Sequence, residues 1–81
     1  MTPRVTLYTR AGCCLCDDAK RVLLAAQERA SFDYDEVDID RDDALRDRYN
    51  DEVPVIAING AKAFKYRVEM HEFLKKLAAR A

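Results

Sequence analysis

Residues 4–16 read RVTLYTRAGCCLC, and this stretch decides the fold of the chain. Arg4 to Thr9 contain alternating apolar side chains rich in β-branched and aromatic types, which predicts a strand. Three cysteines follow, at Cys13, Cys14 and Cys16, and apolar residues at helical spacing begin directly after them. The cysteines are therefore expected in the first turn of a helix that a strand precedes.

Sulfur atoms at such a position are expected to be reactive. Free N–H groups and the positive dipole end of a helix N-terminus favour the thiolate over the thiol. Cys13 stands at the helix entrance and would gain most, and Arg10 is a candidate cation beside it. Cys13 and Cys16 are separated by most of one helical turn, which is near enough for a disulfide. The sequence therefore predicts a dithiol/disulfide switch.

The composition is typical of a small globular protein. Of the 81 residues, 49% are hydrophobic and 36% are charged, a mixture that excludes disordered and membrane-spanning chains. This length has room for one domain, residues 1–81, with one modest core. The first residues contain no apolar signal-peptide core, so we expect a cytoplasmic protein whose thiols are kept reduced. Closely spaced cysteines fit reactive or metal-binding use better than a structural disulfide framework.

Charged residues are unevenly distributed along the chain. Acidic side chains gather between residues 33 and 43, and basic side chains between residues 61 and 81. We interpret these regions as two solvated faces of opposite sign. Lys62, Lys65 and Arg67 form a cluster too short for a nucleic-acid interface, so we expect no nucleic-acid partner. We also expect no membrane partner and a monomeric protein.

The middle of the chain predicts a second strand and a second helix. Apolar residues at helical spacing, from Leu15 to Ala26, predict the helix that carries the cysteines. Phe32 to Ile39 predicts a strand, and its changing apolar phase indicates a bulge or an edge position. Asp40 is expected to cap a short helix that ends near Asn50.

The last third of the chain predicts a hairpin and a final helix. The run VPVIAI from Val53 to Ile58 predicts a buried strand with Pro54 at its start. Asn59-Gly60 predicts a tight turn to an antiparallel strand over Ala61 to Tyr66, and the remainder is helical. The order is therefore βαβαββα. A right-handed crossover between the first two strands places Cys13 at the carboxyl end of the first strand, where ligands bind in open α/β sheets.

Over nearly its full length, the chain resembles short bacterial dithiol glutaredoxin-like proteins of the thioredoxin fold. The residues that carry this resemblance are Tyr8 to Asp17, Glu36 to Asp40, Val53 to Val55 and Tyr66 to Val68. It implies an α/β fold with a mixed four-stranded sheet flanked by helices. It also implies a thiol-disulfide oxidoreductase that acts on disulfide-containing proteins or small molecules.

The resemblance also implies roles for single residues. In similar proteins the first cysteine attacks a disulfide, the second resolves the mixed disulfide, and a cis-proline loop faces the pair. By position these are Cys13, Cys16 and Pro54. A cis bond before Pro54 would turn the Val53 backbone outward, where it could pair with a bound substrate strand.

The region after the predicted hairpin departs from the resemblance. Glutaredoxins typically hold glutathione through a Gly-Gly and an acidic or hydroxyl pair there, and residues 59–70 read NGAKAFKYRVEM. Only basic residues, Arg10, Lys62, Lys65 and Arg67, are placed to hold the glycyl carboxylate of glutathione. We therefore expect no bound cofactor and weak use of glutathione as reductant. A thioredoxin-reductase-type enzyme or a protein dithiol is the expected electron donor.

Two other interpretations of the cysteines stay open at the level of sequence. The chain could be a carrier of a soft metal ion or an iron-sulfur cluster through its thiolates, or a redox-inert interaction module. Cys14 could be an inert residue of the first helical turn, an alternative resolving thiol or a third soft ligand. His71 and the tyrosines Tyr8 and Tyr49 are interpreted as solvated and packing residues respectively.

Overall fold

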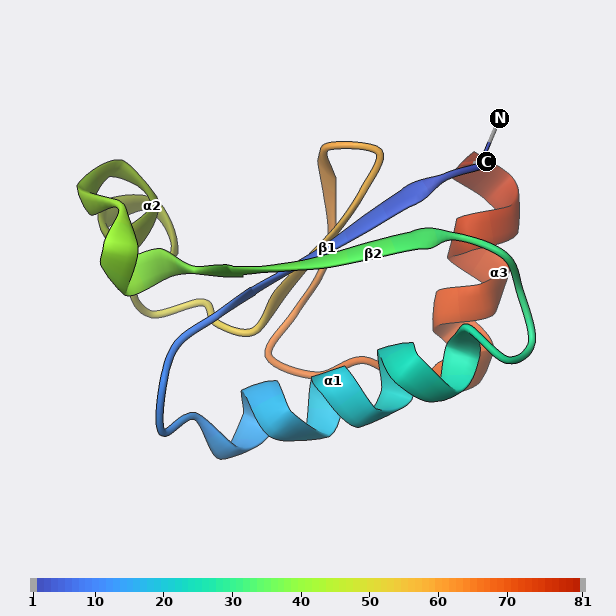
Figure 1. The fold of residues 1–81 in the computed structure, drawn as a ribbon, viewed down its shortest axis with the longest axis horizontal. Helices are drawn as coiled ribbons and strands as arrows, with labels where there is room; N and C mark the ends of the chain where they lie inside the picture. Colours follow the sequence, from blue (N-terminus) through green and yellow to red (C-terminus); the bar gives the residue numbers. More distant parts are fainter. Residues whose placement is uncertain (1, 81) are drawn as a thin grey trace.

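The computed structural model describes residues 2–80, and its elements follow the predicted order (Figure 1). They are β1 (Arg4–Thr9), α1 (Cys14–Ala26), β2 (Asp33–Asp38), a 3₁₀ turn η1 (Ile39–Arg41), α2 (Asp43–Tyr49), β3 (Val55–Ile58), β4 (Ala61–Lys65) and α3 (Met70–Arg80). The two ends of the expected domain, Met1 and Ala81, lie outside the described residues.

The four strands form one mixed sheet in the order β2-β1-β3-β4. β2 lies parallel to β1, with Thr9 opposite Asp38, and β3 and β4 are antiparallel to their neighbours. β2 is an edge strand, as its changing apolar phase predicted. The register irregularity lies between β3 and β4, at Ile56 and Ala57. The predicted mixed four-stranded sheet is confirmed.

A two-residue turn joins β3 to β4. Asn59 and Gly60 have positive φ angles of 53° and 85°. Two successive residues with positive φ give a turn whose twist matches that of the flanking strands. The Asn-Gly hairpin predicted from the sequence is therefore confirmed.

Apolar side chains pack on both faces of the sheet. On one face, side chains of β1 and β3 pack against Leu23 of α1 and Phe73 of α3, and both of these residues are fully buried. On the other face, Tyr49 of α2 packs with Ile39 and Val55. Figure 1 shows α1 below the strands, α3 between the end of α1 and the start of β1, and α2 beyond the end of β2. Among residues 2–80, no helix is both long enough and apolar enough to cross a membrane.

The start of α2 differs from the expectation that Asp40 caps it. The chain first forms the 3₁₀ turn η1, so α2 begins later and Asp42 is its N-cap. The Asp42 carboxylate accepts hydrogen bonds from two backbone N–H groups of the first turn, at 2.9 and 3.3 Å. The prediction for Asp40 is wrong because this turn moves the helix start by two residues. Its carboxylate instead binds Arg10.

Candidate active site

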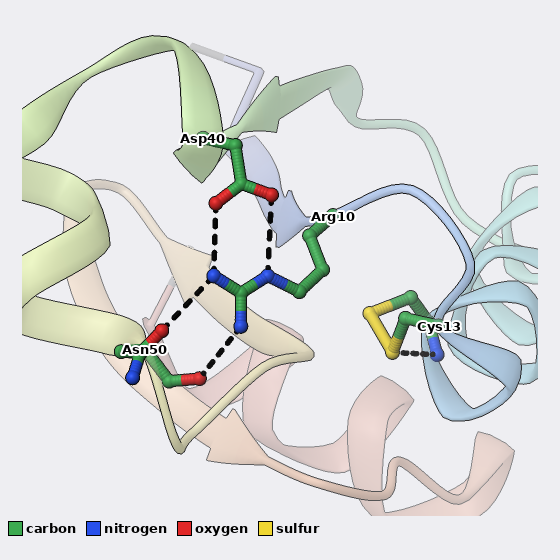
Figure 2. Close-up of a disulfide and its surroundings, with 5 residues drawn as sticks. Arg10, Cys13, Asp40 and Asn50 are labelled. Atoms are coloured by element: carbon green, nitrogen blue, oxygen red, sulfur yellow. Dashed lines mark hydrogen bonds and ion pairs between the residues drawn. A yellow bond between two sulfur atoms is a disulfide. The ribbon is translucent and has the colours of Figure 1, made fainter.

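Cys13 and Cys16 form a disulfide at the N-terminus of α1 (Figure 2). Cys13 is the N-cap of the helix, and its Sγ accepts a hydrogen bond of 3.1 Å from the Cys16 N–H. The two Cα atoms are 5.2 Å apart, within the usual range for a disulfide. Cys16 is only 2% exposed, whereas Cys13 is half-buried. Of the two sulfur atoms, the one of Cys13 is therefore the more accessible to a reagent from solution.

The loop before Cys13 depends on a glycine. Gly12 has a φ of +76°, in the left-handed region that favours glycine. This conformation turns the chain from the end of β1 into α1. It places Cys13 at the carboxyl end of β1, the position that the crossover argument predicted.

Cys14 lies beside the disulfide but takes no part in it. It is exposed and is the free thiol of the chain. Within residues 2–80, no group of three or more His, Cys, Asp or Glu side chains is arranged to hold a metal ion.

Arg10 binds two other segments through its guanidinium group. Its Nη2 and Nε donate to the two carboxylate oxygens of Asp40, at 2.8 and 3.3 Å. Its Nη2 and Nη1 donate to the side-chain and backbone oxygens of Asn50, at 3.0 and 3.1 Å. In Figure 2 the guanidinium is directed toward Asp40 and Asn50 and away from the disulfide. Hydrogen bonding between Arg10 and Asp40 raises the pKa of the guanidinium and lowers the pKa of the carboxyl group.

Val53 and Pro54 lead into β3 beside the end of β1. The peptide bond between them is cis. Because Val55 pairs with Tyr8 near the end of β1, this segment lies at the sheet edge from which the loop to Cys13 departs. The Pro54 carbonyl accepts a hydrogen bond of 2.9 Å from the Tyr66 N–H. No hydrogen bond within residues 2–80 uses the backbone N–H or C=O of Val53.

Most of the basic residues expected to hold a carboxylate are paired with acids of the chain itself. Lys62 and Lys65 lie 2.8 and 3.9 Å from the same carboxylate oxygen of Glu52. The hydrogen bond from Lys62 is the main cause of a lowered pKa of Glu52. With Arg10 bound to Asp40, Arg67 is the one of the four that forms no ion pair within residues 2–80.

An open groove of about 540 Å³ runs between α1 and the segment that joins β4 to α3. Its apolar wall includes Leu15 and Val22 of α1 and Val68 and Met70 on the opposite side. Arg67 also lines the groove, together with the acidic residues Asp18, Glu69 and Glu72. Leu15, which lies in the same first turn of α1 as Cys16, is the lining residue nearest to the disulfide in sequence.

Two further predictions concern residues outside the disulfide. The rings of Tyr8 and Tyr49 pack with their centroids 4.8 Å apart, so their interpretation as packing residues is confirmed. His71 is exposed near the start of α3, as expected for a solvated residue.

Comparison with known proteins places the chain in a family. Residues 4–78 match the glutaredoxin-like domain family (DUF836). The chain belongs to this glutaredoxin-like family. A glutaredoxin-like protein of Dictyostelium discoideum is 32% identical over 71 residues, which cover 80% of this chain and 66% of that protein. The chain therefore spans just under two thirds of the length of this relative.

Solved structures agree with the fold. A structural-genomics target from X. campestris is 33% identical with a TM-score of 0.77, and the match covers 93% of this chain and 96% of that one. A mutant thioredoxin from Halobacterium salinarum has a TM-score of 0.73 at 15% identity, covering 95% of this chain and 73% of that one. The second likeness concerns the fold alone. The predicted thioredoxin-like α/β fold and the predicted family are both confirmed.

Sequence reasoning did not identify Asp40 and Asn50 as partners of Arg10. One signal was present for Asp40. Because β1 and β2 are parallel with Thr9 opposite Asp38, the residues that follow the two strands leave the sheet at the same edge. An arginine directly after one strand and an aspartate two residues after the other are therefore candidates for an ion pair. Asn50 lies at the end of α2, and no pattern in the sequence connects it to Arg10.

Proposed function

We propose that the chain is a thiol-disulfide oxidoreductase in which Cys13 is the nucleophile and Cys16 is the resolving thiol. The observation that carries this proposal is the disulfide itself, which joins the N-cap of α1 to a buried residue one turn further on. A helix N-terminus favours a thiolate at the N-cap, because free N–H groups point toward it. The Cys16 N–H, which donates to the Cys13 sulfur, is one such group.

The proposed reaction proceeds in two exchanges. The Cys13 thiolate attacks one sulfur of the substrate disulfide, so that a mixed disulfide forms and the other substrate sulfur leaves and takes up a proton. The Cys16 thiol then loses its proton and attacks the Cys13 sulfur, which releases the second substrate thiol and forms the Cys13–Cys16 disulfide. Two electrons pass from the dithiol to the substrate. A donor dithiol, which is itself oxidised to a disulfide, would return them by the reverse exchange.

Serine substitutions test the two roles. We expect Cys13→Ser to abolish the reduction of insulin disulfides, because no attacking thiolate remains. We expect Cys16→Ser to accumulate a mixed disulfide that an external thiol releases, which mass spectrometry detects. Equal residual activity of these two variants would contradict the assignment.

Cys14→Ser provides the matched control for this experiment. It removes a sulfur atom from the same helical turn and leaves the disulfide pair intact. Its turnover should stay within about a few-fold of the parent, because adjacent cysteines have poor geometry for a disulfide. A loss as large as that of Cys13→Ser would show that Cys14 takes part in the exchange.

We further propose that a protein dithiol or a thioredoxin-reductase-type enzyme supplies the electrons, and that glutathione is a poor donor. Three of the four basic residues suited to a carboxylate already have acidic partners. The start of α3 is also occupied, because the Glu69 carboxylate accepts a 2.8 Å hydrogen bond from the Glu72 N–H. A ligand with two carboxylates would therefore meet few free donors at either end.

The choice of donor can be tested directly. The reduction of a small mixed disulfide is measured with glutathione and its reductase, and separately with thioredoxin reductase and its nicotinamide reductant. Slow turnover with glutathione at millimolar concentration, together with faster turnover in the second system, is the expected result. Turnover with glutathione as fast as that of a typical dithiol glutaredoxin would overturn this part of the proposal.

Substrate backbone is proposed to bind at Val53. Its N–H and C=O have no partner within residues 2–80, and an extended peptide could pair with them as it would with an open strand edge. The apolar groove beside Leu15 would accept a side chain of the same substrate.

A further inference from the structure

We infer that Arg10 is a positioning residue that holds the Val53–Pro54 segment in place relative to the loop that carries Cys13. This inference rests on the proposed function and goes beyond it. In this inference Arg10 acts by holding the backbone near the disulfide in position. It does not act by its charge on the thiolate or on a substrate carboxylate.

One side chain joins three segments that are distant in the sequence. Arg10 follows β1 and begins the loop to Cys13, Asp40 lies in η1 after β2, and Asn50 begins the connection from α2 to Pro54. The guanidinium donates to two oxygens of each partner, and this planar arrangement fixes direction as well as distance. Figure 2 shows Arg10 between the two partners.

The backbone contact to Asn50 is the important one for the Val53–Pro54 segment. Nη1 donates to the Asn50 carbonyl, four residues before Pro54. The Glu52 N–H donates to the Tyr49 carbonyl at 2.9 Å, so the chain from Asn50 to Val53 begins with a tight turn. On the far side, the Pro54 carbonyl accepts from Tyr66. Arg10 therefore fixes one end of a segment whose other end is fixed by Tyr66, directly after β4.

The charge of Arg10 is already balanced where it lies. Its carboxylate partner is 2.8 Å away, and the guanidinium faces away from the disulfide. A cation whose charge is balanced by a bound carboxylate, and which is directed away from a thiolate, has little effect on that thiolate in water. Its geometric effect is larger, because the Val53 backbone and the Cys13 sulfur must contact the same substrate, and a misplacement of about 1 Å can reduce a rate up to about a hundredfold.

Arg10→Gln is the main test variant, and Arg46→Gln is its matched control. Arg46→Gln removes the same charge and breaks an ion pair to Asp43 on the surface of α2. The Arg46 side chain forms no hydrogen bond or ion pair with either loop, although its charge also helps to lower the pKa of Asp40. All variants are made with Cys14→Ser, so that Cys13 is the accessible thiol of the reduced protein. Three quantities are measured: the rate of Cys13 alkylation by iodoacetamide, kcat and KM for insulin reduction, and amide hydrogen exchange at Glu52 and Tyr66.

For Arg10→Gln we expect an alkylation rate within about twofold of the control, and kcat/KM lower by about tenfold, mainly through KM. Exchange at Glu52 and Tyr66 should become faster, because the Glu52 N–H belongs to the segment that Arg10 holds and the Tyr66 N–H donates to the Pro54 carbonyl of that segment. Arg10→Lys should restore the activity only in part, since a lysine cannot bind Asp40 and Asn50 in the same planar way. Asn50→Ala, which keeps the backbone acceptor, should show the same pattern with a smaller loss and serves if Arg10→Gln does not fold.

Two results would overturn the inference. If alkylation slows as much as kcat/KM falls, Arg10 acts on the thiolate through its charge. If Arg10→Gln matches Arg46→Gln in all three measurements, the network has no role in positioning. Failure of the proposed function is distinguishable, because the unsubstituted protein would then not reduce insulin, while amide exchange would still report whether Arg10 holds the segment.

Discussion

The two sulfur atoms of the disulfide differ in their access to solvent, and this difference predicts the order in which the thiols react. Cys14 is exposed, Cys13 is half-buried and Cys16 is 2% exposed. Alkylation of the oxidised protein should label Cys14 alone. After reduction, Cys13 should react next and Cys16 slowly, because a reagent cannot reach a buried thiol without local opening. Mass spectrometry of peptides gives the order, and early labelling of Cys16 would contradict the assignment of roles.

Gly12 supports the site through its backbone. An added Cβ would meet no atom within 4 Å, so the cost of Gly12→Ala comes from the φ of +76° alone. We expect a loss of about 1 to 2 kcal/mol in the free energy of unfolding, the usual cost of a left-handed conformation for a residue with a Cβ. Urea unfolding measures it. Gly12→Asn is the control and should lose less, because asparagine tolerates positive φ; equal losses would point to a different cause.

At the level of elements, the N-cap of α2 predicts that Asp42 contributes more to stability than the neighbouring Asp43. Asp42→Ala removes the acceptor for two backbone N–H groups and should destabilise the protein by about 1 kcal/mol. Asp43→Ala removes the same charge from the first turn, where the side chain is 86% exposed, and should have a smaller effect. Thermal unfolding compares the two variants. A larger effect of Asp43→Ala would mean that helix charge outweighs the cap.

The order of elements was predictable because each signal is local. The period-2 pattern of β1, the helical spacing after Cys16 and the positive-φ preference of Asn59-Gly60 are all properties of neighbouring residues. The cap of α2 was not predictable in the same way. Asp38, Asp40 and Asp42 are all suitable N-caps by residue type, and the 3₁₀ turn that chooses among them depends on the burial of Ile39 under the sheet.

The site was predictable in its thiols and not in its supporting contacts. Cys13 and Cys16 are three residues apart, and this spacing alone brings them close together within one helical turn. Asp40 and Asn50 are 30 and 40 residues from Arg10, and Glu52 is 10 residues from Lys62, so these contacts depend on strand pairing and loop paths. The contact of Glu69 was also not predictable. Its carboxylate accepts a hydrogen bond from the first turn of α3, and the sequence did not specify at which residue that helix begins.

Across the whole molecule, carboxylates stabilise the junctions between elements. Asp40 links η1 to the loop before Cys13, Glu52 links the Val53–Pro54 segment to β4, and Glu69 binds the first turn of α3. The sheet order also places the acidic strand β2 and the basic strand β4 at opposite edges, which agrees with two faces of opposite charge. The molecule therefore depends on ionised acids at several junctions.

These carboxylates predict how stability depends on pH. Hydrogen bonds from Arg10 and Lys62 lower the pKa of Asp40 and Glu52, and backbone N–H groups lower that of Glu69. A carboxyl group whose pKa is lower in the folded state adds stability that is fully present above its unfolded pKa and is lost as the pH falls through its folded pKa. The unfolded reference values are 3.8 for Asp40 and 4.5 for the two glutamates. Stability should therefore stay level from neutral pH to about pH 5 and decrease below it.

Urea unfolding across this pH range tests the prediction with Asp40→Asn, Glu52→Gln and Glu69→Gln. Each variant should be less stable than the parent at neutral pH and should approach it at low pH, where the parent carboxyl is protonated as well. Added salt should reduce the contribution of Asp40 and Glu52, because exposed ion pairs are screened, and should change that of Glu69 less, because its partners are backbone N–H groups. A constant difference between parent and variant at every pH would instead mean that the substitutions act through packing, and that ionisation of these three groups does not stabilise the fold.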